Sequence, residues 1–121
     1  MRMELTRDYH FEAAHRLPRV PADHPCSRMH GHSFRIGITV AGEMDERMGW
    51  LVDFDAITTL VQPIIDDELD HRTLNDVPGL ENPTSEMLCG WLWQRLRPRL
   101  PELSAITVHE TCTARCTYRG E

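Results

Sequence analysis

The sequence predicts an α+β fold in which an antiparallel four-stranded sheet carries two helices on one face. Two long stretches, residues 3–15 and 30–40, alternate apolar and polar side chains with a period of two, which is typical of strands with one buried face. Two later stretches repeat apolar residues at helical spacing. A shorter alternating stretch over 103–112 and its return over 113–118 complete the predicted sheet.

Length and composition limit the classes of function. The 121 residues are expected to form one domain, residues 1–121, and the net charge of −6 argues against a general nucleic-acid or anionic membrane surface. All 13 basic residues are arginine, which excludes Schiff-base chemistry through a lysine. The start of the chain lacks a secretory signal, and no apolar run approaches the roughly 20 residues that span a bilayer. We therefore expect a cytoplasmic protein with reduced cysteines.

Three histidines fall on the apolar faces of the two long predicted strands. His15 ends the first strand, and His30 and His32 begin the second. If these strands pair antiparallel, the three imidazoles converge at one end of the sheet. Each histidine alone is compatible with a core residue satisfied by a backbone hydrogen bond. Three together indicate a metal site, and three neutral imidazoles with an open fourth position are typical of catalytic zinc.

A cysteine lies just before this histidine pair, at the end of a proline-containing connection over residues 16–29. Cys26 is either a base or nucleophile beside an open-sided metal site, or the fourth ligand of a closed structural zinc site. Cys89 is interpreted as a packing residue. Cys112 and Cys116 lack a second metal-binding pair and are interpreted as small buried residues or hairpin neighbours.

The first predicted helix begins after Asp53, which suits a cap, and Pro63 should kink or divide it. It ends in Asp70 and His71. These two are either solvated charges at a helix end or a carboxylate that fixes the tautomer of an imidazole. Because neighbouring residues do not face each other on a regular helix, the second interpretation requires a loop or a partner chain.

The second predicted helix follows Asn82 and Pro83, which suit a cap and a proline at the first helical position. Thr84 and Ser85 then lie in its first turn, where they either hold a ligand oxygen or simply cap the helix. The expected apolar stripe consists of Met87, Leu88, Trp91, Leu92 and Leu96.

Glu110 continues the apolar row of the 103–112 strand. It is either exposed at the strand end or half-buried, and a half-buried carboxylate needs a cationic or hydrogen-bonding partner.

The opposite face of the predicted sheet is polar and its edge strands are unprotected. Closure of several chains into an oligomeric barrel would cover both.

Six motifs occur along the chain in a recognisable order: Phe11-Glu12-Ala13-Ala14-His15-Arg16-Leu17, Cys26-Ser27-Arg28-Met29-His30-Gly31-His32, Val52-Asp53-Phe54, Leu69-Asp70-His71, Asn82-Pro83-Thr84-Ser85-Glu86 and His109-Glu110-Thr111. With them the chain resembles, over essentially its whole length, the family of 6-pyruvoyl- and 6-carboxy-tetrahydropterin synthases. The short Cys-x-x-x-His-Gly-His spacing is similar to the bacterial queuosine-pathway branch, which forms the carboxy product.

The resemblance implies a tunnelling fold, in which trimers form β-barrels that stack into a homohexamer with active sites at subunit interfaces. It implies a Zn²⁺ cofactor, a pterin substrate and no redox cofactor. The implied site residues are the zinc ligands His15, His30 and His32, the catalytic base Cys26 with its acid/base partners Asp70 and His71, and the pterin anchor Glu110 with Thr84 and Ser85 completing the pocket.

The implied reaction is that of a carbon–carbon lyase. It converts 7,8-dihydroneopterin triphosphate to 6-carboxy-5,6,7,8-tetrahydropterin and releases acetaldehyde and triphosphate, in queuosine biosynthesis. One alternative is the pyruvoyl-forming synthase, which eliminates triphosphate without cleaving the side chain. Another is a non-catalytic, zinc-stabilised binding protein in which Cys26 completes a closed site.

Overall fold

A five-stranded sheet with two helices makes up the computed structural model, which describes all residues from Met1 to Glu121. The strand order is β3-β1-β2-β4-β5. The strands are β1 (Arg2–His15), β2 (His30–Glu43), β3 (Arg72–Thr73), β4 (Leu103–His109) and β5 (Arg115–Tyr118). The helices are α1 (Phe54–Ile64) and α2 (Ser85–Leu96), with short helical turns η1 (Pro25–Ser27), η2 (Ile65–Leu69), η3 (Leu74–Asp76) and η4 (Arg97–Arg99). The predicted α+β class is confirmed.

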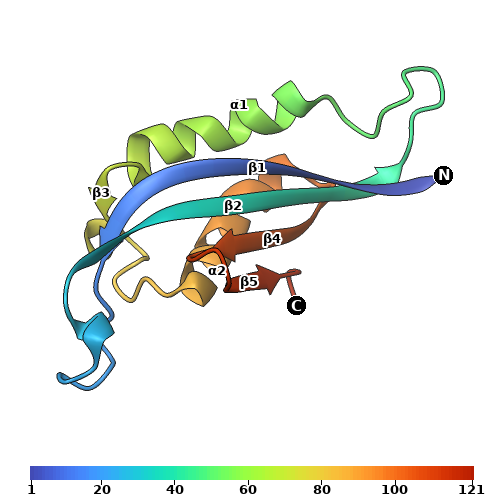
Figure 1. Cartoon of the computed structure of the whole chain (residues 1–121). Coiled ribbons are helices and arrows are strands. Elements are labelled where there is room, and N and C mark those ends of the chain that lie inside the picture. The colour runs from blue at the N-terminus through green and yellow to red at the C-terminus, as the bar shows by residue number, and fades with distance from the viewer.

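The long β1–β2 hairpin is the largest feature of the sheet, and the connection 16–29 projects beyond one end of it (Figure 1). Its antiparallel pairing runs without interruption from Arg2 opposite Glu43 to His15 opposite His30. The apolar parity of each strand faces the helices, as the alternation predicted. Arg7 is the exception on this parity, and its guanidinium lies 5.3 Å from the ring centroid of Phe54. A cation over an aromatic face explains how a charge is accommodated there.

One core of 22 buried residues lies between the sheet and the two helices. Helix α1 contributes Ile57 and Val61, and α2 contributes Leu88, Leu92 and Leu96. The opposite face of the sheet carries cross-strand hydroxyl pairs, such as Thr6 with Thr39 at 2.6 Å. Both helices therefore cover one face, as predicted, and the other face is polar. No helix has the length and apolar character needed to cross a membrane.

The sheet contains one strand more than the sequence predicted. Strand β3 pairs parallel to the end of β1, with Arg72 opposite Ala13 and Thr73 opposite Ala14. The sheet is therefore mixed, and the prediction of four antiparallel strands was incomplete. Two residues are too few to show a hydrophobic period, so this strand left no pattern in the sequence.

Helix α1 begins after Asp53 and ends next to Pro63, the two residues that the sequence analysis singled out. The carboxylate of Asp53 accepts a hydrogen bond from the Asp55 backbone N–H at 2.9 Å, which confirms the predicted cap. Pro63 lies in the last turn, and regular α-helical hydrogen bonding ends at Ile64. The chain continues as the π-helical turn η2, so Pro63 does mark a division of the helix.

The start of α2 differs from the prediction. Thr84, and not Asn82, is the N-cap, and its Oγ1 accepts the Met87 backbone N–H at 3.1 Å. Pro83 lies before the helix and is buried. The expected apolar stripe is also one residue smaller, because Met87 is 46% exposed. A hydroxyl at position 84 reaches the N–H three residues on, which makes it the better-placed cap.

We expect Asp53→Ala to lower the free energy of unfolding by about 1 kcal/mol, because it leaves the first-turn N–H of α1 without its acceptor. Urea denaturation monitored by circular dichroism measures the change. Asp23→Ala, in the exposed 16–29 connection, is the control and should change stability by less than about 0.5 kcal/mol. A cap variant as stable as this control would contradict the assignment.

Candidate functional site

The three histidines converge where β1 ends and β2 begins. The ligand atoms of His15, His30 and His32 all lie within 4.8 Å of one another. Their ring centroids are 4.6 to 5.1 Å apart. This follows from the strand register, which places His15 opposite His30 and Ala13 opposite His32. The predicted convergence is confirmed.

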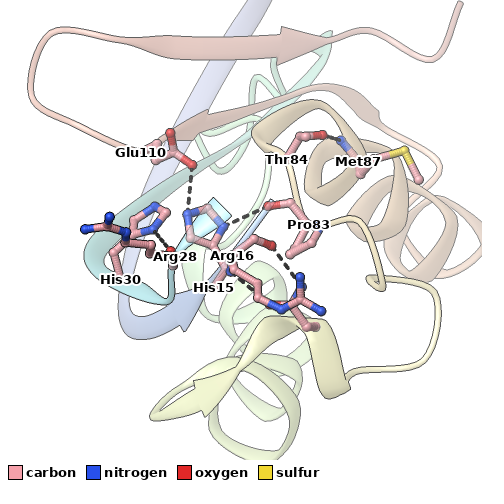
Figure 2. A network of polar contacts seen from close by, with 9 residues as sticks. His15, Arg16, Arg28, His30, Pro83, Thr84, Met87 and Glu110 are labelled. Atoms are coloured by element: carbon pink, nitrogen blue, oxygen red, sulfur yellow. Dashed lines mark hydrogen bonds and ion pairs between the residues drawn. The ribbon is translucent and has the colours of Figure 1, made fainter. Parts of the chain in front are cut away.

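Backbone carbonyls orient two of these imidazoles (Figure 2). His15 Nδ1 donates to the carbonyl of Pro83 at 2.9 Å, and His30 Nδ1 donates to the carbonyl of Arg28 at 2.7 Å. A carbonyl only accepts, so Nδ1 carries a proton in both rings, and in the neutral tautomer the lone pair is on Nε2. Such outer contacts are usual for histidines that bind metals.

Two nitrogens of the cluster are buried without a hydrogen-bond partner, Nε2 of His15 and Nε2 of His32. Leaving a buried polar atom unpaired costs about 1–3 kcal/mol. A divalent metal ion would give both nitrogens a partner at once. The donor set of three imidazoles, two of them with unpaired buried nitrogens, therefore fits zinc.

The environment of His15 keeps this ring neutral. The side chain is 1% exposed, and burial lowers its pKa below the usual 6.5, against the opposing effects of the Pro83 hydrogen bond and the Glu110 charge. A neutral imidazole is the form that binds a metal. The site is thus prepared for a cation at neutral pH.

Glu110 follows β4 and lies at the rim of the histidine cluster. Its Oε1 is 3.4 Å from His15 Nε2, and its side chain is 31% exposed (Figure 2). Of the two positions that the sequence allowed for Glu110, exposed or half-buried, the structure shows the half-buried one. Because His15 is neutral, Glu110 has no full ionic partner, and its carboxylate stays available to hydrogen-bond donors of a ligand.

A loop brings Asp70 and His71 together. His71 adopts the left-handed conformation, with φ of 59°, and its Nδ1 lies 2.9 Å from Asp70 Oδ2. The Glu12 backbone holds both residues: its N–H donates to Asp70 Oδ1 at 2.9 Å, and its carbonyl accepts the His71 N–H at 2.6 Å. The hydrogen bonds from Glu12 and then from His71 lower the pKa of Asp70. The loop, without a partner chain, supplies the required geometry.

His71 and His32 line the same open hollow of about 460 Å³, which Glu12, Ser33 and Arg72 also border. The exposed His71 imidazole therefore lies in a hollow shared with one member of the histidine cluster. A non-glycine residue in the left-handed region carries backbone strain, and such strain is often found at functional sites.

Cys26 is not part of the histidine cluster. It lies in η1, half-buried, and its carbonyl accepts the Leu17 N–H at 2.7 Å, which closes the base of the connection. Its sulfur does not belong to the group of atoms within 4.8 Å of one another. This arrangement disfavours a closed four-ligand site and leaves the thiol without a hydrogen bond.

Thr84 and Ser85 differ in what they offer a ligand. The Thr84 hydroxyl oxygen caps α2, whereas the Ser85 hydroxyl makes no hydrogen bond. The residue before them, Pro83, contacts His15, so the start of α2 lies beside the cluster.

Sequence reasoning missed the contributions of Pro83, Arg28 and Glu12. These residues act through backbone groups, which every residue possesses and which leave no sequence signal.

The sequence matches a known protein family along nearly its whole length. The family model described as 6-pyruvoyl tetrahydropterin synthase matches residues 4–121. A 6-carboxy-5,6,7,8-tetrahydropterin synthase from a Synechocystis species is 38% identical over 94% of this chain and 91% of its own. One of the same name from Bacillus subtilis is 35% identical over 96% of this chain and 84% of its own.

A solved structure shows the same arrangement of strands and helices. The Caenorhabditis elegans 6-pyruvoyl tetrahydropterin synthase superposes with a TM-score of 0.90 at 25% identity, covering 100% of this chain and 97% of that chain. This likeness confirms the tunnelling fold that the sequence motifs implied.

We expect the metal-free protein to lose stability as the pH falls below 6.5. Because burial lowers the pKa of His15 in the folded state, the unfolded chain binds this proton more tightly. The free energy of unfolding therefore rises with pH between the lowered pKa and 6.5 and is reduced below that window. Urea denaturation at pH 7.5 and 5.5, in the presence of a chelator, measures the difference.

His15→Gln removes this titrating group, so the variant should lose less stability between the two pH values. His10→Gln, at an exposed position on the polar face of β1, is the matched control and should leave the pH-dependent loss unchanged. Equal losses in the parent and in His15→Gln would contradict the role of His15 burial.

Proposed function

Because the chain belongs to the 6-pyruvoyl tetrahydropterin synthase family, we propose that it is a zinc-dependent 6-carboxy-5,6,7,8-tetrahydropterin synthase. The proposed reaction converts 7,8-dihydroneopterin triphosphate to the carboxy product with release of acetaldehyde and triphosphate, in queuosine biosynthesis. The observation that carries the proposal is the open-sided cluster of His15, His30 and His32 with Glu110 at its rim. The two carboxy-forming relatives favour this product over the pyruvoyl one.

His15, His30 and His32 are the proposed zinc ligands. Bound zinc would supply a Lewis acid that polarises the side-chain hydroxyls of the substrate and makes the adjacent C–H more acidic. The protein's own contribution is to hold the rings of His15 and His30 in one tautomer through the carbonyls of Pro83 and Arg28.

Cys26 is the proposed base and Asp70 with His71 the proposed acid/base pair. The Cys26 sulfur makes no hydrogen bond and is not part of the histidine cluster, which suits a group that takes a proton. A nearby cation favours its thiolate form. Asp70 Oδ2 accepts from His71 Nδ1, which leaves His71 Nε2 for proton transfer during rearrangement and carbon–carbon cleavage.

Glu110 is the proposed pterin anchor. A carboxylate presents two acceptors and matches a pterin's amino and ring N–H donors in a bidentate manner. The exposed edge of Glu110 and its lack of a full ionic partner support this role. Ser85, with its hydroxyl unpaired, and Thr84 are proposed to complete the pterin pocket.

We further propose a homo-oligomer, a hexamer of two stacked trimeric barrels with active sites at subunit interfaces. Strand β3 covers only two residues of the β1 edge, at Ala13 and Ala14, and β5 ends the other side of the sheet. Unpaired edges and a polar face are features that closure into a barrel would cover. No hydrogen bond joins Cys26 to the Asp70–His71 pair within one chain, which suits a site assembled between chains.

Product analysis tests the proposed reaction. Purified zinc-loaded protein is incubated with 7,8-dihydroneopterin triphosphate, and acetaldehyde, triphosphate and pterin products are quantified. We expect acetaldehyde and triphosphate in equal amounts with the 6-carboxy product. Triphosphate without acetaldehyde would replace the proposal with the pyruvoyl-forming reaction, and absence of turnover with tight pterin binding would favour a binding protein.

We expect Cys26→Ala to retain one zinc per chain and to lose turnover by about 10²–10⁴-fold, since the cysteine moves a proton and does not hold the metal. Zinc content by metal analysis and acetaldehyde release measure the two effects. Cys112→Ala, at an exposed cysteine, should change neither, and His30→Ala should reduce both. Loss of zinc from Cys26→Ala would count against its role as a base.

We expect Glu110→Gln to weaken pterin binding by at least about tenfold, because one strong acceptor becomes a donor facing the pterin N–H groups. Fluorescence titration with a pterin product measures affinity, and thermal unfolding should show an unchanged fold. Unchanged affinity would remove the anchor hypothesis.

A further inference from the structure

Asn75 has a contact pattern that none of the roles above explains. It lies in η3, directly after the short strand β3. Its side-chain Oδ1 accepts the Arg16 backbone N–H at 3.0 Å, and its Nδ2 donates to the Arg16 carbonyl at 2.9 Å. One side-chain amide therefore pairs both backbone groups of a single residue.

This pairing lies just beyond the end of the parallel ladder between β3 and β1. The backbone of β3 is paired with Ala13 and Ala14, and the chain then turns into η3. The Asn75 side chain then pairs with Arg16, the first residue after β1 and two residues beyond Ala14. The structure gives the backbone of Arg16 no other hydrogen-bond partner.

Arg16 occupies a critical position because it lies between two groups of the proposed site. Its preceding residue is the cluster member His15. Its following residue, Leu17, donates its N–H to the carbonyl of Cys26 at 2.7 Å. A clamp on Arg16 therefore fixes both the end of the strand that carries His15 and the base of the connection that carries Cys26.

Asn75 also contacts the segment that orients the His15 ring. Its Nδ2 lies 3.4 Å from the carbonyl of Glu81, two residues before Pro83. The Pro83 carbonyl is the acceptor for His15 Nδ1. Asn75 thus links the strand that carries His15 to the loop that supplies the hydrogen bond fixing its tautomer.

We propose that Asn75 is a positioning residue for the metal centre, acting on zinc through His15. Without this amide, the N–H and C=O of Arg16 lose their partners at the point where β1 ends, and His15 is no longer held at the angle that directs its Nε2 into the cluster. The inference rests on the metal site of the proposed function, and not on which pterin product is formed.

Two variants separate the parts of the clamp. Asn75→Ala removes both hydrogen bonds to Arg16. Asn75→Asp has nearly the same shape and keeps an acceptor for the Arg16 N–H, but it sets a carboxylate against the carbonyls of Arg16 and Glu81. The Asp variant tests the clamp even if the Ala variant fails to fold.

Zinc affinity of the full chain is measured by competition with a chelating dye, without substrate. We expect both variants to bind zinc about 10–100-fold more weakly than the parent, the range usual for loss of outer contacts to metal ligands. We also expect the cobalt-loaded variants, at saturation, to show shifted visible absorption bands, which a merely structural role would not change.

Ser104→Ala is the matched control. It removes one side-chain hydrogen bond to a backbone carbonyl, that of Thr39 at 3.2 Å, from a position where β2 pairs with β4. Its zinc affinity should stay within about twofold of the parent.

Asn75 variants with parental zinc affinity and parental cobalt spectra would overturn the inference, as would a loss of zinc affinity no greater than that of Ser104→Ala. A parent that binds zinc but releases no acetaldehyde would refute the proposed reaction alone. A parent that binds no zinc would overturn the metal centre and the positioning role together.

Discussion

The antiparallel register of β1 and β2 is the constraint on which the candidate site depends. By placing His15 opposite His30, it sets three imidazoles on one face at the end of a long hairpin. A shift of one residue would send the side chains of one whole strand to the other face, which would expose either Phe11 or Phe34 and would separate His15 from His30 and His32. The burial of the core therefore also holds the histidine cluster together, because the same parity of β1 and β2 places both on one face.

The site combines this rigid register with contacts from segments that are distant in sequence. The Pro83 carbonyl comes from the loop before α2, and the Glu110 carboxylate follows β4. Each contact acts on His15, which is buried and neutral. The unpaired Nε2 atoms of His15 and His32 are unfavourable without a ligand, and this instability is the expected counterpart of affinity for a cation.

A second constraint sets the geometry of Asp70 and His71. The left-handed conformation of His71 turns its imidazole back onto the preceding carboxylate, and the Glu12 backbone holds both residues against β1. Strand β3 and Asn75 then extend this attachment along the same edge. The Asp70–His71 pair and the histidine cluster are thus both positioned by the last residues of β1, although their residues come from different elements.

Local patterns in the sequence determined the α+β class, the burial parity of His15, His30 and His32, the Asp53 cap and the division at Pro63, because each depends on residue spacing within one or two elements. Tertiary structure alone decided the short strand β3, the left-handed turn at His71 and the meeting of Pro83 and Glu110 at His15. These features arise from backbone groups and from contacts between distant segments. Such groups are present in every residue, so only the folded chain selects which of them meet.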